Sequence, residues 1–85
     1  MKILKFYKDN CGPCDEIENV LLQVSSQFNI PIEYIDNTCL TELAKSYNIL
    51  SNPSIALLDD TGNLLLTHTG LLTVEDLTTM INKFL

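Results

Sequence analysis

A pair of cysteines separated by two residues is the feature of this sequence that could most directly do chemistry. Cys11, Gly12, Pro13 and Cys14 stand between a short apolar run and a long segment with helical spacing of apolar residues. The N-terminus of a helix carries partial positive charge and stabilises a thiolate, so Cys11 could attack at neutral pH. The spacing places the Cys14 sulfur on the same helix face, within reach of a disulfide. The motif therefore predicts a redox pair, with Cys11 as nucleophile and Cys14 as resolving thiol.

The alternative is that these two cysteines form half of a zinc site or are inert core thiols. A structural zinc site needs four ligands, and Cys39 and His68 are the other cysteine and histidine, each alone in the sequence. We therefore favour redox chemistry over metal binding. Cys39 follows the second predicted strand and should share a rim with Cys11, where it could be glutathionylated or form a regulatory bridge. We expect instead a small buried hydrophobe at Cys39, and an exposed edge-strand histidine at His68.

Length and composition restrict the class of protein. The 85 residues are enough for one domain over residues 1–85, and 46% hydrophobic with 19% charged residues is typical of a globular chain. A net charge of −6 argues against nucleic-acid binding and against docking on anionic lipid. Met1 leads directly into a predicted strand, so we expect no secretory signal and no membrane span. The odd number of cysteines is not that of a structural disulfide framework, which favours a reducing cytoplasm.

Short apolar runs and turn residues divide the chain into strands and helices. Strands are predicted over residues 2–7, 30–35, 54–58 and 64–69, each rich in branched or aromatic side chains. The segment 59–63, Asp-Asp-Thr-Gly-Asn, is a strong turn signal, so the last two strands should form a hairpin. Between and after these strands, apolar residues recur at helical spacing.

Each predicted helix has its own start signal and apolar face. The first begins at Pro13 and stops near Asn29, with its apolar face at Ile17, Val20, Leu21, Val24 and Phe28. The second is capped by Asn37 or Thr38, with its apolar face at Leu40, Leu43, Ala44 and Tyr47. The third opens on a capping box of Thr73 and Asp76, with its apolar face at Val74, Leu77, Ile81, Phe84 and Leu85. The predicted order is β-α-β-α-β-β-α.

This order predicts an α/β fold. The strand-helix-strand unit gives parallel strands joined by a right-handed crossover, and the hairpin adds two antiparallel strands. The result is a four-stranded mixed sheet with helices on both faces.

The chain resembles the thioredoxin family in its small, glutaredoxin-sized form, and the resemblance covers essentially the whole chain. Phe6-Tyr7 followed by the Cys-Gly-Pro-Cys motif is the first match. Tyr47-Asn48-Ile49 leading to Asn52-Pro53-Ser54 is the second, and Gly70 before the last helix is the third. The resemblance implies a thioredoxin-like fold and a thiol-disulfide oxidoreductase that reduces client disulfides. It also implies that Pro53 is cis and faces the cysteine pair, whereas Pro31 is expected to be trans.

The resemblance also implies roles for further residues. Gly12, Pro13, Pro53, Tyr7 and Lys5 are expected to support the cysteine pair, and Asn10, Asn52 and Gly70 to contact the client. No cofactor is expected on the chain, which would be a monomer in cell redox homeostasis. Electrons are expected from NADPH through a thioredoxin reductase, and ribonucleotide reductase is one candidate client.

Two other functions stay open from the sequence. One is a glutathione-dependent, glutaredoxin-like enzyme, although Gly70-Leu71-Leu72-Thr73 does not match the glycine pair and acids of that family's glutathione signature. The other is a non-catalytic adaptor that uses the fold only as a docking surface.

Three positions depart from the pattern of the family. Asn10 stands where thioredoxins usually carry tryptophan, and Asp15 and Glu16 follow Cys14 where a lysine is common. Lys5 stands six residues before Cys11, where the family has a buried aspartate that assists proton transfer. A buried Lys5 could carry protons. We expect instead that its stem packs and its ammonium reaches a carboxylate such as Glu33 or Asp36.

Overall fold

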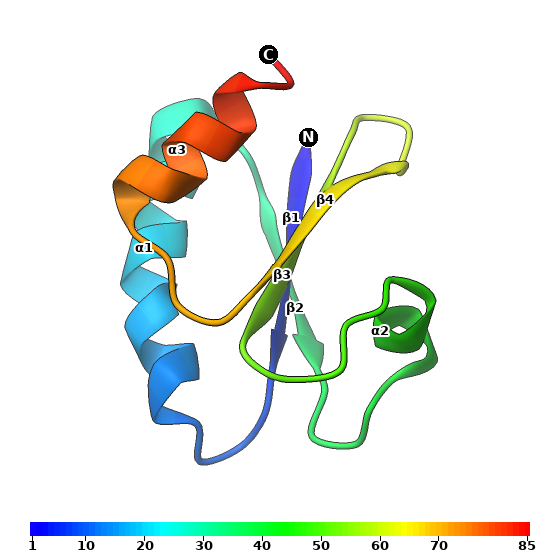
Figure 1. Cartoon of the computed structure of the whole chain (residues 1–85). Coiled ribbons are helices and arrows are strands. Elements are labelled where there is room, and N and C mark those ends of the chain that lie inside the picture. Colours follow the sequence, from blue (N-terminus) through cyan, green and yellow to red (C-terminus); the bar gives the residue numbers. More distant parts are fainter.

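The computed structural model describes residues 1–85 and has the predicted order of elements (Figure 1). The strands are β1 (Lys2–Tyr7), β2 (Ile32–Asp36), β3 (Ser54–Leu58) and β4 (Leu64–Thr69). The helices are α1 (Gly12–Phe28), α2 (Glu42–Ser46) and α3 (Val74–Asn82). No helix combines the length and the apolar character that crossing a bilayer requires.

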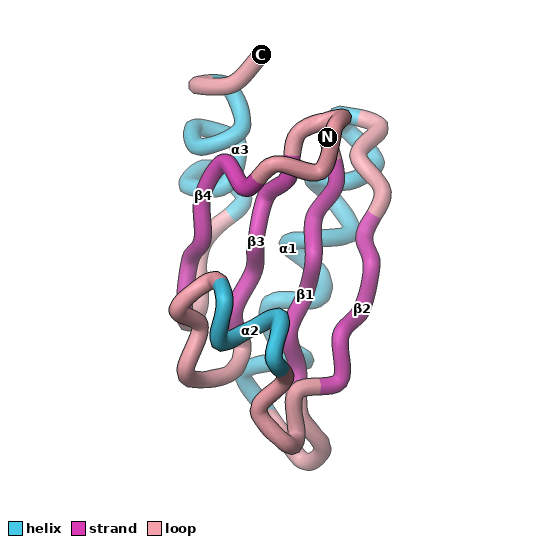
Figure 2. The backbone as a smooth tube through the Cα atoms, turned by 90° about the vertical axis from the view of Figure 1, so that its right-hand side faces the viewer, coloured by secondary structure: helices cyan, strands magenta, loops and turns pink.

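The four strands form one mixed sheet in the order β2-β1-β3-β4. β1 pairs in parallel with β2 and antiparallel with β3, and β3 pairs antiparallel with β4. Figure 2 shows α2 in front of this sheet and α1 behind it. The predicted mixed sheet with helices on both faces is therefore confirmed, with β1 and β3 as its central strands.

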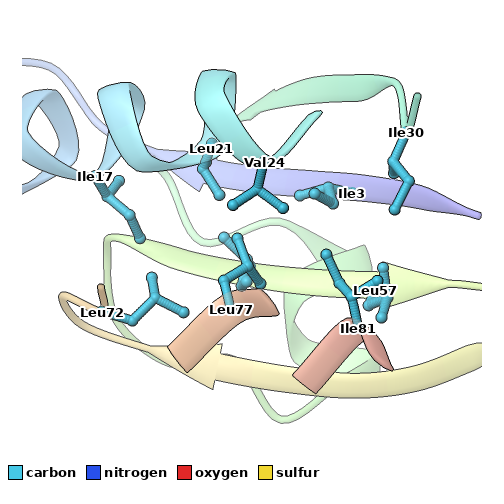
Figure 3. Packing of buried hydrophobic residues seen from close by; sticks show 10 residues of the cluster. Ile3, Ile17, Leu21, Val24, Ile30, Leu57, Leu72, Leu77 and Ile81 are labelled. Atoms are coloured by element: carbon cyan, nitrogen blue, oxygen red, sulfur yellow. The ribbon is translucent and has the colours of Figure 1, made fainter. Parts of the chain in front are cut away.

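Alternation along the central strands divides the buried residues into two clusters. The larger cluster lies between the sheet and helices α1 and α3, and ten buried residues form it (Figure 3). The smaller cluster, six buried residues, lies on the α2 face. In β1, Ile3 belongs to the first cluster and Leu4 and Phe6 to the second. Lys5 thus points to the same side as Ile3, toward α1, because successive side chains of a strand alternate between faces.

Helix α1 has clear start and stop signals in the sequence. Cys11 is its N-cap, and proline stands in the first turn, where a missing N–H costs no hydrogen bond. Asn29 ends the helix with φ 58°, in the left-handed region that asparagine tolerates better than most residues, and its N–H donates to the Ser25 carbonyl. Ile17, Leu21 and Val24 are buried against the sheet. The predicted end at Asn29 is confirmed, and the helix starts one residue before the predicted start, at Gly12.

The second strand and the second helix begin later than predicted. β2 starts at Ile32 because Ile30 donates its N–H to Ser25 in the end of α1. α2 starts at Glu42 with Thr41 as its N-cap, and the Thr41 hydroxyl accepts from the Ala44 N–H at 3.1 Å. The prediction of Asn37 or Thr38 as the cap is therefore wrong. Half of the predicted apolar face is exposed, since Leu40 and Leu43 are 39% and 37% exposed, whereas Ala44 is buried and Tyr47 packs against the smaller cluster.

The last helix opens on the predicted capping box. The Thr73 hydroxyl accepts from the Asp76 N–H at 3.0 Å, and the Asp76 carboxylate accepts from the Thr73 N–H at 3.4 Å. Leu77 and Ile81 are buried as predicted. Phe84 and Leu85 lie beyond the end of α3 and are exposed, so the predicted apolar face is too long at this end.

Candidate redox site

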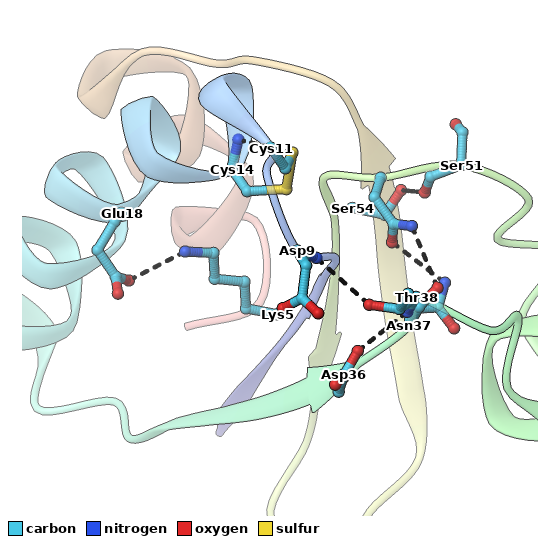
Figure 4. Close-up of a disulfide and its surroundings, with 11 residues drawn as sticks. Lys5, Asp9, Cys11, Cys14, Glu18, Asp36, Asn37, Thr38, Ser51 and Ser54 are labelled. Carbon is cyan, nitrogen blue, oxygen red and sulfur yellow. Dashed lines mark hydrogen bonds and ion pairs between the residues drawn. A yellow bond between two sulfur atoms is a disulfide. The ribbon is translucent and has the colours of Figure 1, made fainter.

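Cys11 and Cys14 form a disulfide where β1 passes into α1 (Figure 4). Their Cα atoms are 5.2 Å apart, within the range that a disulfide requires. Both side chains are buried, and Cys11, at 7% exposed, is slightly more accessible than Cys14, at 3%. Gly12 and Pro13, between them, are exposed in the first turn of α1. The motif therefore presents a sulfur pair at the surface end of a helix.

The start of α1 offers polar groups to the Cys11 sulfur. The Cys14 N–H donates to Cys11 Sγ at 3.1 Å, as the N-cap geometry requires. The same N–H and the partial positive charge of the helix N-terminus would face a thiolate at Cys11 in the reduced pair. The Cys14 N–H is thus engaged with the Cys11 sulfur, and Cys14 itself lies inside the helix. The geometry thus favours charge on Cys11 over charge on Cys14.

The loop before the cysteines is held to the neighbouring strand-to-helix connection. The Asp9 N–H donates to the Thr38 hydroxyl at 3.3 Å. Asn10, exposed next to Cys11, has φ 54°, a conformation in which asparagine is several-fold enriched. Asparagine at this position is therefore compatible with the backbone turn that brings the chain into the helix.

The Asn52–Pro53 peptide bond is cis and the bond before Pro31 is trans, as expected. Pro53 is buried, and its carbonyl accepts from the Gly70 N–H at 2.8 Å. Gly70 has φ +92°, in the region that favours glycine, so the chain can turn there directly after β4. Pro53, expected to support the cysteine pair, and Gly70, expected to contact the client, are thus joined by a backbone hydrogen bond.

Asn37 is a functional candidate that sequence reasoning considered only as a helix cap. Its side chain is 2% exposed and makes two side-chain hydrogen bonds. It donates to Asn52 Oδ1 at 3.1 Å and accepts from the Thr41 N–H at 2.8 Å. The Asn52 amide in turn donates to the Asn37 carbonyl at 3.4 Å. Asn37 therefore fixes the side chain of Asn52, the residue before Pro53. In the sequence, the signal for this role is an asparagine at the end of a predicted strand.

Comparison with known proteins decides the family. The thioredoxin family model matches residues 1–83. The chain belongs to the thioredoxin family. A prophage-derived thioredoxin-like protein, YosR of Bacillus subtilis, is 36% identical over 62 residues, which are 73% of this chain and 72% of YosR. With the Cys11–Cys14 pair at disulfide distance, this membership makes the chain a thiol-disulfide oxidoreductase.

Solved thioredoxins have the same fold over nearly the whole chain. Thioredoxin 1 of Thermosipho africanus superposes with a TM-score of 0.81 at 20% identity, covering 99% of this chain and 93% of its own. A mutant thioredoxin of Halobacterium salinarum superposes with a TM-score of 0.85 at 28% identity, covering 98% of this chain and 73% of its own. The thioredoxin pre-protein of Schistosoma mansoni gives 0.80 at 25% identity, with 99% and 78% covered.

Lys5 is a buried lysine in the strand that leads to the cysteine pair. It is only 5% exposed, and its Nζ lies 3.4 Å from Glu18 Oε1, on α1. The Nζ also lies 5.6 Å from the centre of the Tyr34 ring. In Figure 4 the side chain extends from β1 toward α1, where it meets Glu18. The expected packing and charge pairing of Lys5 are therefore present, but with a buried ammonium and a different partner.

The two carboxylates expected to pair with Lys5 are engaged elsewhere. Glu33 is the register partner of Leu4, on the opposite face of the sheet, and pairs with Lys2 at 3.2 Å. Asp36 accepts from the Thr38 N–H at 3.0 Å. That bond and the Thr38 hydroxyl hold the pKa of Asp36 below its usual value. The expectation is wrong for two reasons. Strand alternation directs the Glu33 side chain to the face of the sheet opposite Lys5, and the Asp36 carboxylate is hydrogen-bonded to Thr38 in the loop after β2.

A small cavity joins this charged group to the resolving cysteine. Its volume is about 290 Å³, and Lys5, Tyr7, Cys14, Glu18 and Tyr34 are among its lining residues. The Tyr34 hydroxyl donates to Glu18 Oε1 at 3.0 Å. Partial burial, followed by this hydrogen bond and the negative charge of Glu18, raises the pKa of Tyr34. Tyr7, expected to support the site, is half-buried at this cavity.

The single cysteine and histidine lie apart from this chemistry. Cys39 is exposed and free, so the expectation of a buried thiol is wrong. It stands in the loop before Thr41, because the helix that would have buried it starts later than predicted. His68 is on edge strand β4 as expected, but it is half-buried, and its Nε2 donates to the Leu71 carbonyl at 3.1 Å. No three acidic, cysteine or histidine side chains gather where a metal ion could be held.

Proposed function

We propose that this protein reduces disulfides in client proteins, with Cys11 as nucleophile and Cys14 as resolving thiol. The observation that carries the assignment is the position of Cys11 as the N-cap of α1, with the Cys14 N–H directed at its sulfur. That position supports a thiolate at Cys11 in the reduced protein. The greater burial of Cys14, one turn further into the helix, supports its role in the second step.

The reaction takes two thiol-disulfide exchanges. The Cys11 thiolate attacks one sulfur of a client disulfide, forming a mixed disulfide and releasing the other client sulfur as a thiolate. Cys14 loses its proton and attacks Cys11 Sγ, which breaks the mixed disulfide and forms the Cys11–Cys14 bond. The second client sulfur leaves as a thiolate and takes a proton from water. The client gains two electrons, and the protein loses two.

A client surface around Asn10, Asn52, Pro53 and Gly70 fits this reaction. The hydrogen bond between Pro53 and Gly70 supports their placement on one rim. The bonds from Asn37 to Asn52 support a rigid approach to that rim. The shared family adds weight to this surface. Gly12, Pro13, Tyr7 and Lys5 would support the pair from within the first βα unit.

Recycling by a protein reductase fits the sequence better than recycling by glutathione. The segment Gly70-Leu71-Leu72-Thr73 lacks the glycine pair and acids of a glutathione site. We therefore propose that electrons come from NADPH through a thioredoxin reductase, and that this chain binds no cofactor. A single domain over residues 1–85, acting as a monomer in a reducing cytoplasm, completes the proposal. Ribonucleotide reductase is one client of suitable chemistry.

Trapping with single-cysteine variants tests the roles of the pair. In Cys14→Ser, Cys11 can still attack but nothing resolves the product, so mixed disulfides with clients should accumulate on non-reducing gels. In Cys11→Ser, no adduct should form at this site, because the Cys14 sulfur is shielded inside the helix. Both variants carry Cys39→Ser so that the exposed thiol adds no adducts. Equal trapping by both variants would overturn the roles, and trapping by neither would support an adaptor.

Insulin reduction tests the source of electrons. Turnover should be efficient with NADPH and a thioredoxin reductase, and slow with glutathione and glutathione reductase at the same protein concentration. Efficient turnover in the glutathione system alone would assign a glutaredoxin-like function instead.

A further inference from the structure

One cavity is lined both by a buried cation and by the cysteine that must ionise second. Lys5 and Cys14 both line it, Lys5 from β1 and Cys14 from α1. The Lys5 side chain is 6% exposed, and its Nζ has Glu18 at 3.4 Å and the Tyr34 ring centre at 5.6 Å. Glu18 also accepts from Tyr34, so one carboxylate orients both the ammonium and the tyrosine. The ammonium is thereby held by Glu18 and Tyr34 on the cavity that Cys14 also lines.

Few other groups around Cys14 favour its ionisation to a thiolate. It is 3% exposed, and burial disfavours the charged form of a thiol. The Cys14 N–H points at Cys11, so the helix terminus favours charge on the first sulfur. Helix α1 contains acidic residues and no lysine or arginine to offset them. A cation for Cys14 must therefore come from outside the helix.

We propose that Lys5 is a positioning residue whose ammonium stabilises the thiolate of Cys14 when the client is released. Glu18 and Tyr34 hold the ammonium in place for this step. The inference rests on the proposed function, in which Cys14 is the resolving thiol. It differs from a purely structural role, in which the Lys5–Glu18 pair would only satisfy two polar groups next to the core.

The step balances in protons and electrons. The Cys14 thiol of the mixed disulfide gives its proton to water in the cavity, and Lys5 keeps all its protons. The thiolate attacks Cys11 Sγ, the Cys11–Cys14 bond forms, and the bond from Cys11 to the client sulfur breaks. The client sulfur leaves with the bonding pair and takes a proton from water.

The energetics of burial favour a functional reason for this lysine. A buried ion pair is often no more stable than apolar residues of similar volume, because desolvation offsets the attraction between the charges. Lys5→Met removes only one partner, but the Glu18 carboxylate that it leaves is 32% exposed and still accepts from Tyr34, so the cost in stability should be modest. The contrast with Lys2 is informative, since Lys2, also on β1, pairs with Glu33 on β2 at 3.2 Å with both side chains about half exposed. That exposed pair is a matched control for the buried one.

Other charged groups face the same cavity and must be considered in its pH dependence. Lys8 follows β1, Tyr7 ends it, and Asp15 lies beside Cys14 in the first turn of α1. Lys8 and Asp15 are both exposed, so solvent screens their charges more than that of Lys5. Lys5 and Glu18 are therefore the two charges expected to move the ionisation of Cys14 most, and in opposite directions.

The test measures the resolving step alone. Reduced Cys39→Ser protein reacts with dithiobis(nitrobenzoate), which places a thionitrobenzoate on Cys11 and releases one coloured thiolate. Attack by Cys14 then releases the second coloured thiolate, and its rate follows from stopped-flow absorbance between pH 5 and 9. We expect the rate to rise with pH through a midpoint that reports ionisation of Cys14.

Two variants should move this midpoint in opposite directions. Lys5→Met should raise it by about one pH unit or more, the usual effect of losing a neighbouring opposite charge, and slow release about tenfold at pH 7. Glu18→Gln should lower the midpoint, because a negative charge is removed while the amide oxygen still accepts from the ammonium. Lys5→Arg should restore most of the rate, and Lys2→Met should match the parent protein.

Each outcome decides the inference. A Lys5→Met profile that coincides with the parent profile, or a shift of the same sign in Lys5→Met and Glu18→Gln, overturns it. Thermal unfolding checks that each variant is folded; if Lys5→Met is not, Glu18→Gln decides alone, and a midpoint that it does not lower overturns the inference. Failure of the proposed function looks different: Cys14→Ser would then release the second thiolate as fast as the parent protein.

Discussion

Two strand-to-helix connections at the same edge of the sheet each carry a cysteine, but only one of them makes a redox site. The connection after β1 places Cys11 at the N-cap of α1, bonded to Cys14 and 7% exposed. The connection after β2 leaves Cys39 free and exposed, ahead of the short helix α2. The parallel pairing of β1 and β2 brings both connections to one rim. Position at this edge is therefore not enough to make a cysteine reactive.

The difference lies in the helix that follows each strand. α1 has 17 residues and buries Ile17, Leu21 and Val24, so its N-terminus is held firmly at the site. α2 has five residues and buries only Ala44. The Asp9–Thr38 hydrogen bond at 3.3 Å joins the two connections, so the second acts as a support for the first. A long, well-packed helix supplies both the position and the local charge that the thiol chemistry needs.

The largest expected effect separates the two cysteines directly. Cys11→Ser should reduce insulin turnover to the rate without protein, because no thiolate remains at the helix N-terminus to attack. Cys39→Ser should leave turnover within about twofold of the parent, since the thiol is outside the pair and surface substitutions are usually mild. Insulin precipitation with NADPH and a thioredoxin reductase measures both. A loss of turnover in Cys39→Ser would show that the two connections share the chemistry.

The second prediction compares the packing of the two helices. Leu21→Ala should destabilise the protein by about 2–5 kcal/mol, because a fully buried leucine leaves a cavity beneath α1. Leu43→Ala on α2 should cost less than about 1 kcal/mol, because that side chain is 37% exposed. Urea denaturation followed by circular dichroism gives both values. Equal costs would mean that α2 is packed as firmly as α1, against the burial of the two side chains.

The third prediction concerns the polar link from the second connection to the client surface. Asn37→Ala should destabilise the protein by about 1–3 kcal/mol, because the part-buried Thr41 N–H and the side-chain oxygen of Asn52 each lose a partner. It should also raise the KM for insulin more than it lowers kcat, since Asn52 loses one of its two hydrogen bonds to Asn37 while the cysteine pair is untouched. Asn63→Ala in the β3–β4 turn is the control, with no change in KM expected. An unchanged KM in Asn37→Ala would remove Asn52 from the client surface.

The sequence was sufficient for the first connection because its signals are local. The cysteine spacing, the proline in the first turn and the apolar positions up to Phe28 all lie within one helix, and each predicts the observed structure. The cis bond before Pro53 followed from the resemblance to thioredoxins, not from any local signal. Local signals and family resemblance therefore account for most of the fold and for the disulfide.

The second connection could not be predicted because its residues have distant partners. Asn37 and Thr38 are plausible helix caps, yet Asn37 bonds to Asn52 and Thr38 accepts from Asp9. The partner of Lys5 was missed for a similar reason, since only the packing of α1 on the sheet brings Glu18 to it. Tertiary contacts determine the hydrogen-bond and ion-pair partners of these side chains, and the spacing of residues in the sequence does not predict such contacts.

The smallest expected effect is a titration within the second connection. Asp36 accepts from the Thr38 N–H at 3.0 Å, and this bond, followed by the Thr38 hydroxyl, lowers the pKa of Asp36 in the folded protein. A carboxyl with a lowered pKa contributes stability above its unfolded pKa of about 3.9. That contribution is lost as the pH falls below this value through the folded pKa. Because the carboxyl is fully exposed, the change in stability should be slight, and the titration itself is the better measurement.

Thr38→Ala should move the pKa of Asp36 part of the way back toward its ordinary value, because the hydroxyl bond is lost while the backbone N–H remains. Carbon-detected NMR of the side-chain carboxyls between pH 2 and 6 follows this change. Asp59 is an internal control, since its lowered pKa comes from Asn63 and Thr61 and should not respond to the variant. If Asp36 titrates identically with and without the Thr38 hydroxyl, the backbone N–H alone holds this loop, and the side chain of Thr38 serves only the link to Asp9.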